Sequence, residues 1–342
     1  MFKQSFYFLL IIIGWSCSSP ADSPYDPITF VSKSVMSPVG PVPARASAVA
    51  FVIEGYGYVA LGRTAVRSSD QYSNSALNDC WQYNPTLDSW TQKSSFPGIP
   101  RVNSIAEVIN GKAYVGLGYN LSKGVYTDGN LFDLWMYNPD NDSWTKKASL
   151  DSLKTTASNA CVSFVYNENI YICAGFDGVG FNKEFWKFNP EEGKSGTLTQ
   201  LNGFPGYGRT GAVICANNEH IYFGTGFNTY NQSDWWEYFP RTDTWKQLKT
   251  IPDMGRENAT SLCVNNRFFV ATGRNFGGNL SGGYFKSDIM EYDVSNNVWY
   301  KRGNLPGDDR ENAISFSING KGYIGFGGND TKVLNDFWSF EP

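Results

Sequence analysis

A block of 18 residues recurs six times along this chain, and the repeat limits the possible folds more than any other feature. In the copy from Arg101 to Gly118, two short runs of alternating character flank Asn110-Gly111. That dipeptide is preferred in type I′ hairpin turns, because both residues tolerate positive φ. Each copy therefore predicts a β-hairpin. Five copies place an arginine 17 residues before a glycine, and their first residues are Arg45, Arg101, Arg209, Arg256 and Arg310. The sixth, Ser158 to Gly175, keeps the spacing without the arginine.

A second motif follows most hairpins and predicts two further strands. It consists of two aromatic residues, a turn, and a tryptophan seven residues later, as in Trp135, Tyr137 and Trp144. Each repeat is thus a four-stranded meander of roughly 50 residues, the length of a propeller blade. The last repeat ends at Pro342 after only three strands, so we expect residues 28–34 to supply the fourth. Closing the ring in this way removes its free edges.

The hairpin that ends in glycine, the aromatic pair and the trailing tryptophan resemble the kelch repeat, over residues 28 to 342. The resemblance implies an all-β fold, a six-bladed β-propeller of four-stranded blades. Kelch repeats usually end the second strand in Gly-Gly. In this chain Gly327-Gly328 is the one such pair, and the other five copies have a single glycine at that place.

The N-terminus has the features of an export signal. Lys3 precedes an apolar run from Phe6 to Ile13, which is too short to span a bilayer. The next residues, Gly14 to Cys17, resemble a bacterial lipobox with Gly14 in place of the usual leucine. This implies a lipoprotein signal peptide at 1–16, a lipidated Cys17, a tether at 17–27 and the propeller at 28–342. The alternative is ordinary cleavage near Ala21.

These features predict an exported monomer that is anchored to the bacterial outer membrane only through its lipid. The sequence leaves open whether the protein faces the periplasm or the outside. Five cysteines remain after Cys17, and we expect buried thiols without a disulfide. They are Cys80, Cys161, Cys173, Cys215 and Cys263.

Composition excludes several kinds of chemistry. The net charge of −4 gives no basic excess for nucleic acid. His220 is the one histidine, which we expect to be solvated at a hairpin turn. A single imidazole cannot build the copper site of galactose oxidase, a related propeller enzyme, or a Ser/His/Asp triad. We therefore expect no metal and no cofactor.

Strand direction gathers a set of polar and aromatic side chains at one mouth of the ring. Strand one begins at this mouth and strand two ends there, so the five repeat arginines share it with the residues that follow the glycines. The candidate ligand contacts are Arg45, Arg101, Arg209, Arg256, Arg310, Arg63, Arg274, Tyr119, Phe176 and Phe227. Guanidinium groups pair with carboxylates and aromatic rings stack on sugars, so the mouth suits an acidic carbohydrate or an acidic protein loop.

Two alternatives stay open at this stage. The repeat arginines can instead serve the ring, by bonding neighbouring carbonyls or by pairing with Glu257, Glu311, Asp308 and Asp309. The expected function is a binding or scaffold module. The alternative is a carbohydrate-acting enzyme, because exported bacterial kelch propellers include sialic acid epimerases (mutarotases) that need no metal. Its acid/base groups would be Asp177, Glu257 or Glu311.

Overall fold

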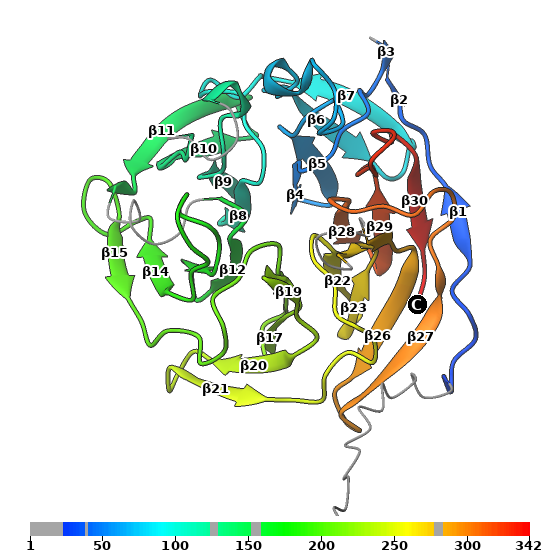
Figure 1. The fold of residues 1–342 in the computed structure, drawn as a ribbon. Helices are drawn as coiled ribbons and strands as arrows, with labels where there is room; N and C mark the ends of the chain where they lie inside the picture. Colours follow the sequence, from blue (N-terminus) through cyan, green and yellow to red (C-terminus); the bar gives the residue numbers. More distant parts are fainter. Residues whose placement is uncertain (1–22, 38–39, 124–128, 152–158, 277–282) are drawn as a thin grey trace, which may run out of the picture.

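The computed structural model describes residues 23–37, 40–123, 129–151, 159–276 and 283–342. Six four-stranded antiparallel sheets are arranged as blades around a central axis (Figure 1). The predicted all-β, six-bladed propeller is therefore confirmed.

The blades follow one another along the chain, and each contributes four strands. Blade one comprises β4 (Val49–Ile53), β5 (Tyr56–Ala60), β6 (Cys80–Asn84) and β7 (Ser89–Lys93). Blade two comprises β8 (Ile105–Ile109), β9 (Lys112–Gly116), β10 (Asp133–Asn138) and β11 (Ser143–Ser149). Blade three comprises β12 (Val162–Tyr166), β13 (Asn169–Cys173), β14 (Phe185–Asn189) and β15 (Thr197–Gln200). Blade four comprises β16 (Val213–Ala216), β17 (Ile221–Gly224), β20 (Trp235–Phe239) and β21 (Thr244–Gln247); blade five β22 (Thr260–Val264), β23 (Arg267–Ala271), β26 (Asp288–Asp293) and β27 (Val298–Asn304); blade six β28 (Ile314–Ile318), β29 (Lys321–Gly325), β30 (Phe337–Phe340) and β1 (Phe30–Ser32).

The inner two strands of each blade form the predicted hairpin. In blade two, Ile109 pairs with Lys112 across the turn, where Asn110 and Gly111 have φ of 49° and 73°. Positive φ at both central residues defines the type I′ turn that the Asn-Gly dipeptide predicts. The two-residue turn fixes the register of the whole hairpin.

The N-terminal strand closes the ring as predicted. β1 pairs antiparallel with β30, with Phe30 opposite Phe340 and Ser32 opposite Trp338. Figure 1 shows the blue β1 alongside the red β30, with the C-terminus at the same outer edge. The two ends of the chain are thereby joined in one sheet, which leaves blade six without an unfinished edge.

A short N-terminal latch precedes β1. The ring of Tyr25 lies over two guanidinium groups, 4.3 Å from Arg267 and 5.0 Å from Arg302, and Arg302 Nη2 donates to the Asp26 carbonyl at 2.7 Å. Both arginines also pair with the buried carboxylate of Glu291. Arg267 starts β23 just after a hairpin turn, so the latch lies at the end of the ring opposite the mouth.

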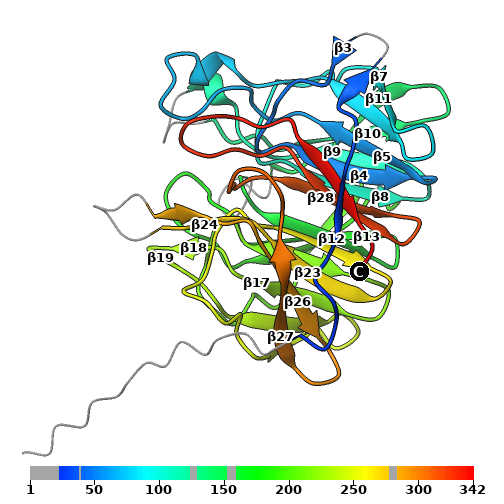
Figure 2. The ribbon, with the colours of Figure 1, turned by 90° about the vertical axis from the view of Figure 1, so that its right-hand side faces the viewer.

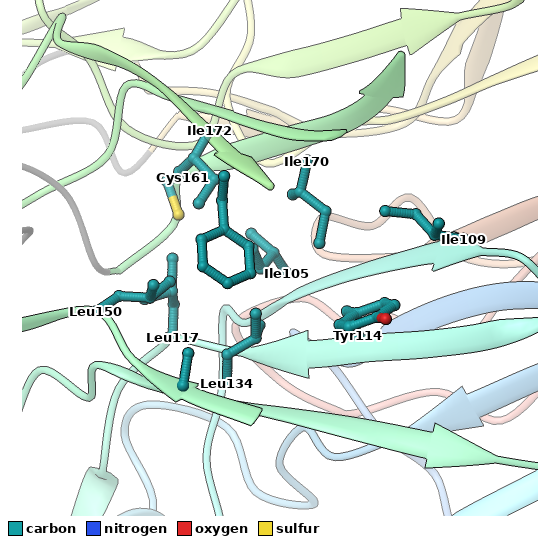
Figure 3. Close-up of a cluster of buried hydrophobic side chains, with 11 residues drawn as sticks. Ile105, Ile109, Tyr114, Leu117, Leu134, Leu150, Cys161, Ile170 and Ile172 are labelled. Atoms are coloured by element: carbon teal, nitrogen blue, oxygen red, sulfur yellow. The ribbon is translucent and has the colours of Figure 1, made fainter. Parts of the chain in front are cut away.

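Apolar side chains fill the wedges between neighbouring blades. Figure 3 shows the wedge between blades two and three, where Ile105, Leu117 and Leu134 meet Ile170 and Ile172. Each of these residues is buried. Because every blade packs on two neighbours, the repeated aromatic residues serve the packing of the ring.

In blades one, two, four and five, the turn before the outer strand ties the blade to the segment that follows the preceding blade. Asp142 has φ of 50° and accepts bonds from Tyr137 Oη at 2.7 Å and Ser94 N at 3.0 Å. Trp144 Nε1 donates to the Ser94 carbonyl at 2.8 Å. The Asp-Ser-Trp sequence is therefore a turn with an inter-blade role, as expected from its place before strand four.

The cysteines behave largely as predicted, and His220 does not. The five described cysteines form no disulfide; four are buried, and Cys263 is half-buried. His220 is not freely solvated, because Nδ1 lies 2.8 Å from Glu237 Oε1 and the ring stacks on Tyr222. The difference arises because the short β16–β17 hairpin brings His220 against the neighbouring strand.

The predicted signal segment at 1–16, Cys17 and the first part of the predicted tether lie outside the described residues and stay predictions. Within the described part of the chain, no helix is long and apolar enough to cross a membrane.

Candidate functional site

A closed ring of backbone hydrogen bonds surrounds the axis at the mouth. We call the six residues that form it the collar: Ser47, Asn103, Ala160, Gly211, Asn258 and Asn312. Each collar residue has positive φ, and its N–H donates to the carbonyl of the collar residue in the preceding blade, over 2.8 to 3.3 Å. The collar surrounds a cavity of about 170 Å³ and forms the floor of the mouth.

Further cavities continue from the collar into the central channel. Small side chains such as Ala48, Ser104 and Cys161 line both the collar cavity and the next one, of about 250 Å³. A third, of about 400 Å³, lies beyond. Glu107 lines the second and third cavities, and Ser163 Oγ donates to its carboxylate at 2.6 Å. Burial raises the pKa of Glu107 to about 7.

The five repeat arginines lie beneath the mouth surface and are fully buried. Each makes a two-pronged ion pair with the aspartate that precedes the first aromatic position of strand three: Arg45 with Asp79, Arg101 with Asp133, Arg209 with Asp234, Arg256 with Asp288, and Arg310 with Asp336. Nη1 of each also donates to the carbonyl of the residue before the repeat glycine.

This geometry favours the structural alternative for these arginines. The arginines bond to backbone carbonyls, as that alternative predicts. The predicted carboxylate partners were wrong, because the arginines pair with the strand-three aspartates and not with the side chains of Glu257, Glu311, Asp308 and Asp309. Strand three begins at the mouth beside strand one, so its first carboxylate lies against the guanidinium. In blade five, Asp253 on the preceding turn pairs with Arg256 as well. A fully buried guanidinium has no surface left for a ligand.

Blade three lacks both halves of the ion pair. The sequence has Ser158 in place of the arginine and Glu184 in place of the aspartate. Among the described residues, Glu184 Oε2 and Trp186 Nε1 are buried without a partner, whereas Trp135 Nε1 of blade two donates to Asp133 at 2.6 Å. Arginine and aspartate are thus present together or absent together, as expected of two parts of one structural unit.

The backbone at the end of strand two explains the repeat glycine. Gly118 has φ of 90°, and a Cβ there would lie 2.5 Å from the Val102 carbonyl oxygen. The residue before it, Leu117, also has positive φ, at 56°. In blade six the left-handed pair is Phe326-Gly327, and Gly328 lies outside it, so matching Gly327-Gly328 to the usual Gly-Gly was wrong. Non-glycine residues occupy the first place of this pair in every blade.

Two glutamates occupy equivalent places at the mouth in neighbouring blades. Glu257 exchanges backbone hydrogen bonds with Arg274, and Glu311 does so with Gly328. Glu311 is only 5% exposed, and its Oε2 accepts from Asn258 Nδ2 at 2.8 Å. The other four blades have Ala46, Val102, Asn159 and Thr210 at this place, so acids occur only in blades five and six.

The two carboxyl groups are electrostatically coupled. Burial raises the pKa of Glu257 to about 7, and the negative charge of Glu311 adds to the rise, while Arg67 and Arg274 oppose it. At neutral pH Glu257 therefore exists in both protonation states. A carboxyl group with this property, in a mouth, is a candidate general acid or base.

Arg67 is the basic residue at the mouth that the sequence analysis missed. It comes from the long loop of blade one, where the repeat pattern gives no register, and its side chain is exposed. Desolvation within the mouth acts to lower the pKa of Arg67, but the charges of Glu311, Glu257 and Asp330, with the Tyr72 phenol, outweigh it and raise the pKa. Arg67 is thus placed to hold an anion near the two glutamates.

The predicted contacts Arg63 and Arg274 lie deeper. Arg63 is 4% exposed, with its guanidinium 5.5 Å from the Tyr72 ring and a bond to the Ala65 carbonyl, and burial lowers its pKa. Arg274 faces Asp330 at 3.3 Å. Both therefore support the site chiefly through their charge.

The remaining predicted residues surround the mouth on the other blades. Tyr119, Phe176 and Phe227 are half-buried, and each pairs through its backbone with the start of strand one of its blade. Asp177 is a weaker candidate for the acid/base role. Burial acts to raise its pKa, but hydrogen bonds from the N–H groups of Gly180 and Val179 outweigh burial and lower the pKa. No group of three or more potential metal ligands occurs among the residues that the structure describes.

Comparison with known proteins adds the family. Residues 124–273 match the family model described as the KLHDC2/KLHL20/DRC7 Kelch-repeats domain. A solved structure described as "Structure of YjhT" superimposes with a TM-score of 0.71 at 20% identity, over 89% of this chain and 96% of that one.

The curated relatives are similar in sequence over shorter stretches. An N-acetylneuraminate epimerase of Escherichia coli O9:H4 is 34% identical over 115 residues, 33% of this chain and 30% of that protein. One from Shigella sonnei is 36% identical over 110 residues, 32% and 28% of the two chains. One from Escherichia coli O157:H7 is 27% identical over 215 residues, 62% and 51%. The matched segments thus span about half the length of these relatives or less. The chain is thus a six-bladed β-propeller with repeated hairpins, and its residues 124–273 match a kelch-repeat family model.

Proposed function

We propose that this propeller is a metal-independent epimerase (mutarotase) that exchanges the anomers of an acidic sugar at its mouth. The observation that carries the proposal is the coupled pair Glu257 and Glu311, with Arg67 beside it. Curated relatives named N-acetylneuraminate epimerase support the same class of substrate.

The reaction needs only proton transfers. One carboxyl group gives its proton to the ring oxygen of the sugar, while the other takes the proton of the anomeric hydroxyl. The bond between the ring oxygen and the anomeric carbon breaks, and a carbonyl group forms. After rotation of the open chain, the reverse transfers close the ring on the other face, so no atom or electron is gained or lost. Arg67 pairs with the carboxylate of the sugar throughout.

The test is anomer exchange measured by NMR saturation transfer with N-acetylneuraminate. Glu257→Gln and Glu311→Gln should each lower the catalysed rate about a hundredfold or more, the usual contribution of a positioned acid or base. Glu219→Gln, an exposed glutamate at the far end of the ring, is the matched control and should leave the rate unchanged. A wild-type rate equal to the spontaneous rate would remove the proposal.

Binding without catalysis is the second candidate, and the exposure of Arg67 favours it. In this role the propeller is a binding or scaffold module that captures an acidic glycan or an acidic protein loop. In that case the wild type would catalyse no anomer exchange, and Glu257→Gln and Glu311→Gln would leave the affinity for the ligand intact. Arg67→Ala would weaken binding.

The location of the protein is a further proposal, which rests on the sequence. A lipid on Cys17 would anchor a monomeric propeller to the bacterial outer membrane. Labelling with a radioactive fatty acid, abolished by Cys17→Ala, is the direct test.

A further inference from the structure

A continuous band of aromatic rings crosses the mouth from blade three to blade five. Phe176 lies 5.7 Å from Phe181, which lies 5.8 Å from Phe227, which lies 6.0 Å from Phe276, measured between ring centroids. The Arg274 guanidinium lies 5.3 Å from Phe276 and 4.9 Å from Phe285, at the end of the band. Because Arg274 is also bonded through its backbone to Glu257, the band runs directly into the candidate acid/base site.

Two short β-ribbons hold the blade-four and blade-five part of the band in place. They are β18 (Phe227–Asn228) with β19 (Tyr230–Asn231), and β24 (Arg274–Asn275) with β25 (Tyr284–Phe285). Figure 2 shows them projecting together from one side of the disc. The Asn231 side chain joins the ribbons, accepting from Phe276 N at 2.6 Å and donating to the Arg274 carbonyl at 3.3 Å. The surface is therefore built before any ligand arrives.

The ribbons also present exposed tyrosines. Tyr230 is 75% exposed and Tyr284 is 59% exposed. They pair with Asn228 and Asn275, so the alternation along each strand puts them on the ribbon face opposite to Phe227 and Phe285, outside the band.

The mouth is consequently divided into two halves. Blades one, six and five supply the ionic half, with Arg67, Glu311 and Glu257, while blades three, four and five supply the aromatic half. A single acidic sugar held at the ionic half leaves the blade-three end of the band uncovered. Each step along the band is comparable in length to one pyranose ring.

We propose that the aromatic band is a platform for further sugar rings, so that the ligand is an oligosaccharide whose acidic sugar lies at the ionic half. This inference rests on the proposed function and adds one requirement to it. Anomer exchange needs a free anomeric hydroxyl, so the acidic sugar must be the reducing end of the oligosaccharide. The remaining sugars extend over Phe276 and Phe227 towards Phe176.

The test compares affinities for N-acetylneuraminate and for its linear dimer and trimer, by NMR titration of the full propeller. We expect the trimer to bind the wild type about tenfold more tightly than the monosaccharide. Phe181→Leu should reduce this preference and leave monosaccharide affinity and anomer exchange unchanged, whereas Tyr230→Ala and Tyr284→Ala, on the opposite face of the two ribbons, should leave the preference unchanged. Tyr56→Ala removes an aromatic ring of 37% exposure at the far end of the ring and is the matched control.

The outcomes separate the platform from the catalytic proposal. Equal affinity for monosaccharide and trimer, or equal loss of both in Phe181→Leu, would overturn the platform. A length preference that Phe181→Leu abolishes would support it, even if the wild type failed to exchange anomers, in which case only the proposed function would fall. Melting temperatures of the three variants close to wild type would exclude misfolding as the source of a loss.

Discussion

Asp133 holds Arg101 through two parallel hydrogen bonds of 2.6 and 3.0 Å, in a place where the guanidinium is fully buried. The pair joins the first strand of blade two to its third. Burial alone would raise the pKa of Asp133, but the bonds from Arg101 outweigh it and lower the pKa. The same unit recurs in four other blades, so it is part of how each blade is built.

Removing one partner of this pair should destabilise the protein strongly. We expect Arg101→Ala to lower the free energy of unfolding by about 3–5 kcal/mol, since it leaves a carboxylate with no counter-charge. Asp133→Ala should cost a similar amount, and the double variant less than the sum. Urea unfolding measures all three. If Arg101→Ala kept the stability of the wild type but lost ligand binding, Arg101 would be a ligand contact and not a structural residue.

Thr272→Gly should stabilise the protein. Thr272 has φ of 60°, and its buried Oγ1 has no hydrogen-bond partner among the described residues. Glycine removes the left-handed strain, about 1–2 kcal/mol, and the unsatisfied hydroxyl, against the greater entropy of glycine in the unfolded chain. The expected net gain is about 1 kcal/mol, read from urea unfolding.

Leu117→Gly is the matched control for that substitution, because Leu117 has nearly the same φ, at 56°, in the equivalent place. Its side chain is packed in the wedge between blades two and three. We therefore expect a loss of about 2–5 kcal/mol from the lost packing. Destabilisation of both variants would show that backbone strain does not govern this position.

Glu107 should make stability depend on pH. Its pKa is about 7 in the folded protein, above the ordinary glutamate value, so the folded state binds the proton more tightly. Its contribution is greatest below about pH 4 and is lost as the pH rises towards 7, by up to about 3 kcal/mol. Unfolding of wild type and Glu107→Gln at pH 5 and pH 8 gives the difference. A constant difference between these two pH values would contradict the assignment.

The titration of Glu257 should respond to its neighbours in opposite directions. Glu311→Gln removes a negative charge and should lower the pKa of Glu257 from about 7, while Arg67→Ala removes a positive charge and should raise it. Carbon-13 NMR of labelled side-chain carboxyl groups measures both. No change in either variant would mean that the two glutamates and Arg67 are too far apart to act together.

The repeat made the fold predictable, whereas the chemistry of the mouth was only partly so. Spacing alone located every hairpin, because a type I′ turn fixes register locally. The burial of Arg101 was not visible in the sequence, since its partner Asp133 lies 32 residues later, across a loop of variable length. Comparing the six copies would have found it, because the one blade without the arginine also lacks the aspartate.

Arg67 and Glu107 were missed for different reasons. Arg67 belongs to a loop without repeat register, so only the fold shows that it reaches Glu311 and Glu257. Glu107 had a signal: the equivalent residues of the other blades are Phe51, Phe164, Cys215, Leu262 and Phe316. A carboxyl group among apolar equivalents indicates a special environment, here the central channel.

The N-terminal latch would orient the propeller if Cys17 carried a lipid. The Tyr25 ring lies against Arg267 and Arg302 of blade five at the end of the ring remote from the mouth, and Cys17 stands only eight residues earlier in the chain. Eight residues reach about 28 Å at most when fully extended. A lipid on Cys17 would therefore hold the disc with its far face towards the bilayer and its mouth turned outward, so that the ligand would be captured from the surrounding fluid and not from the lipid surface.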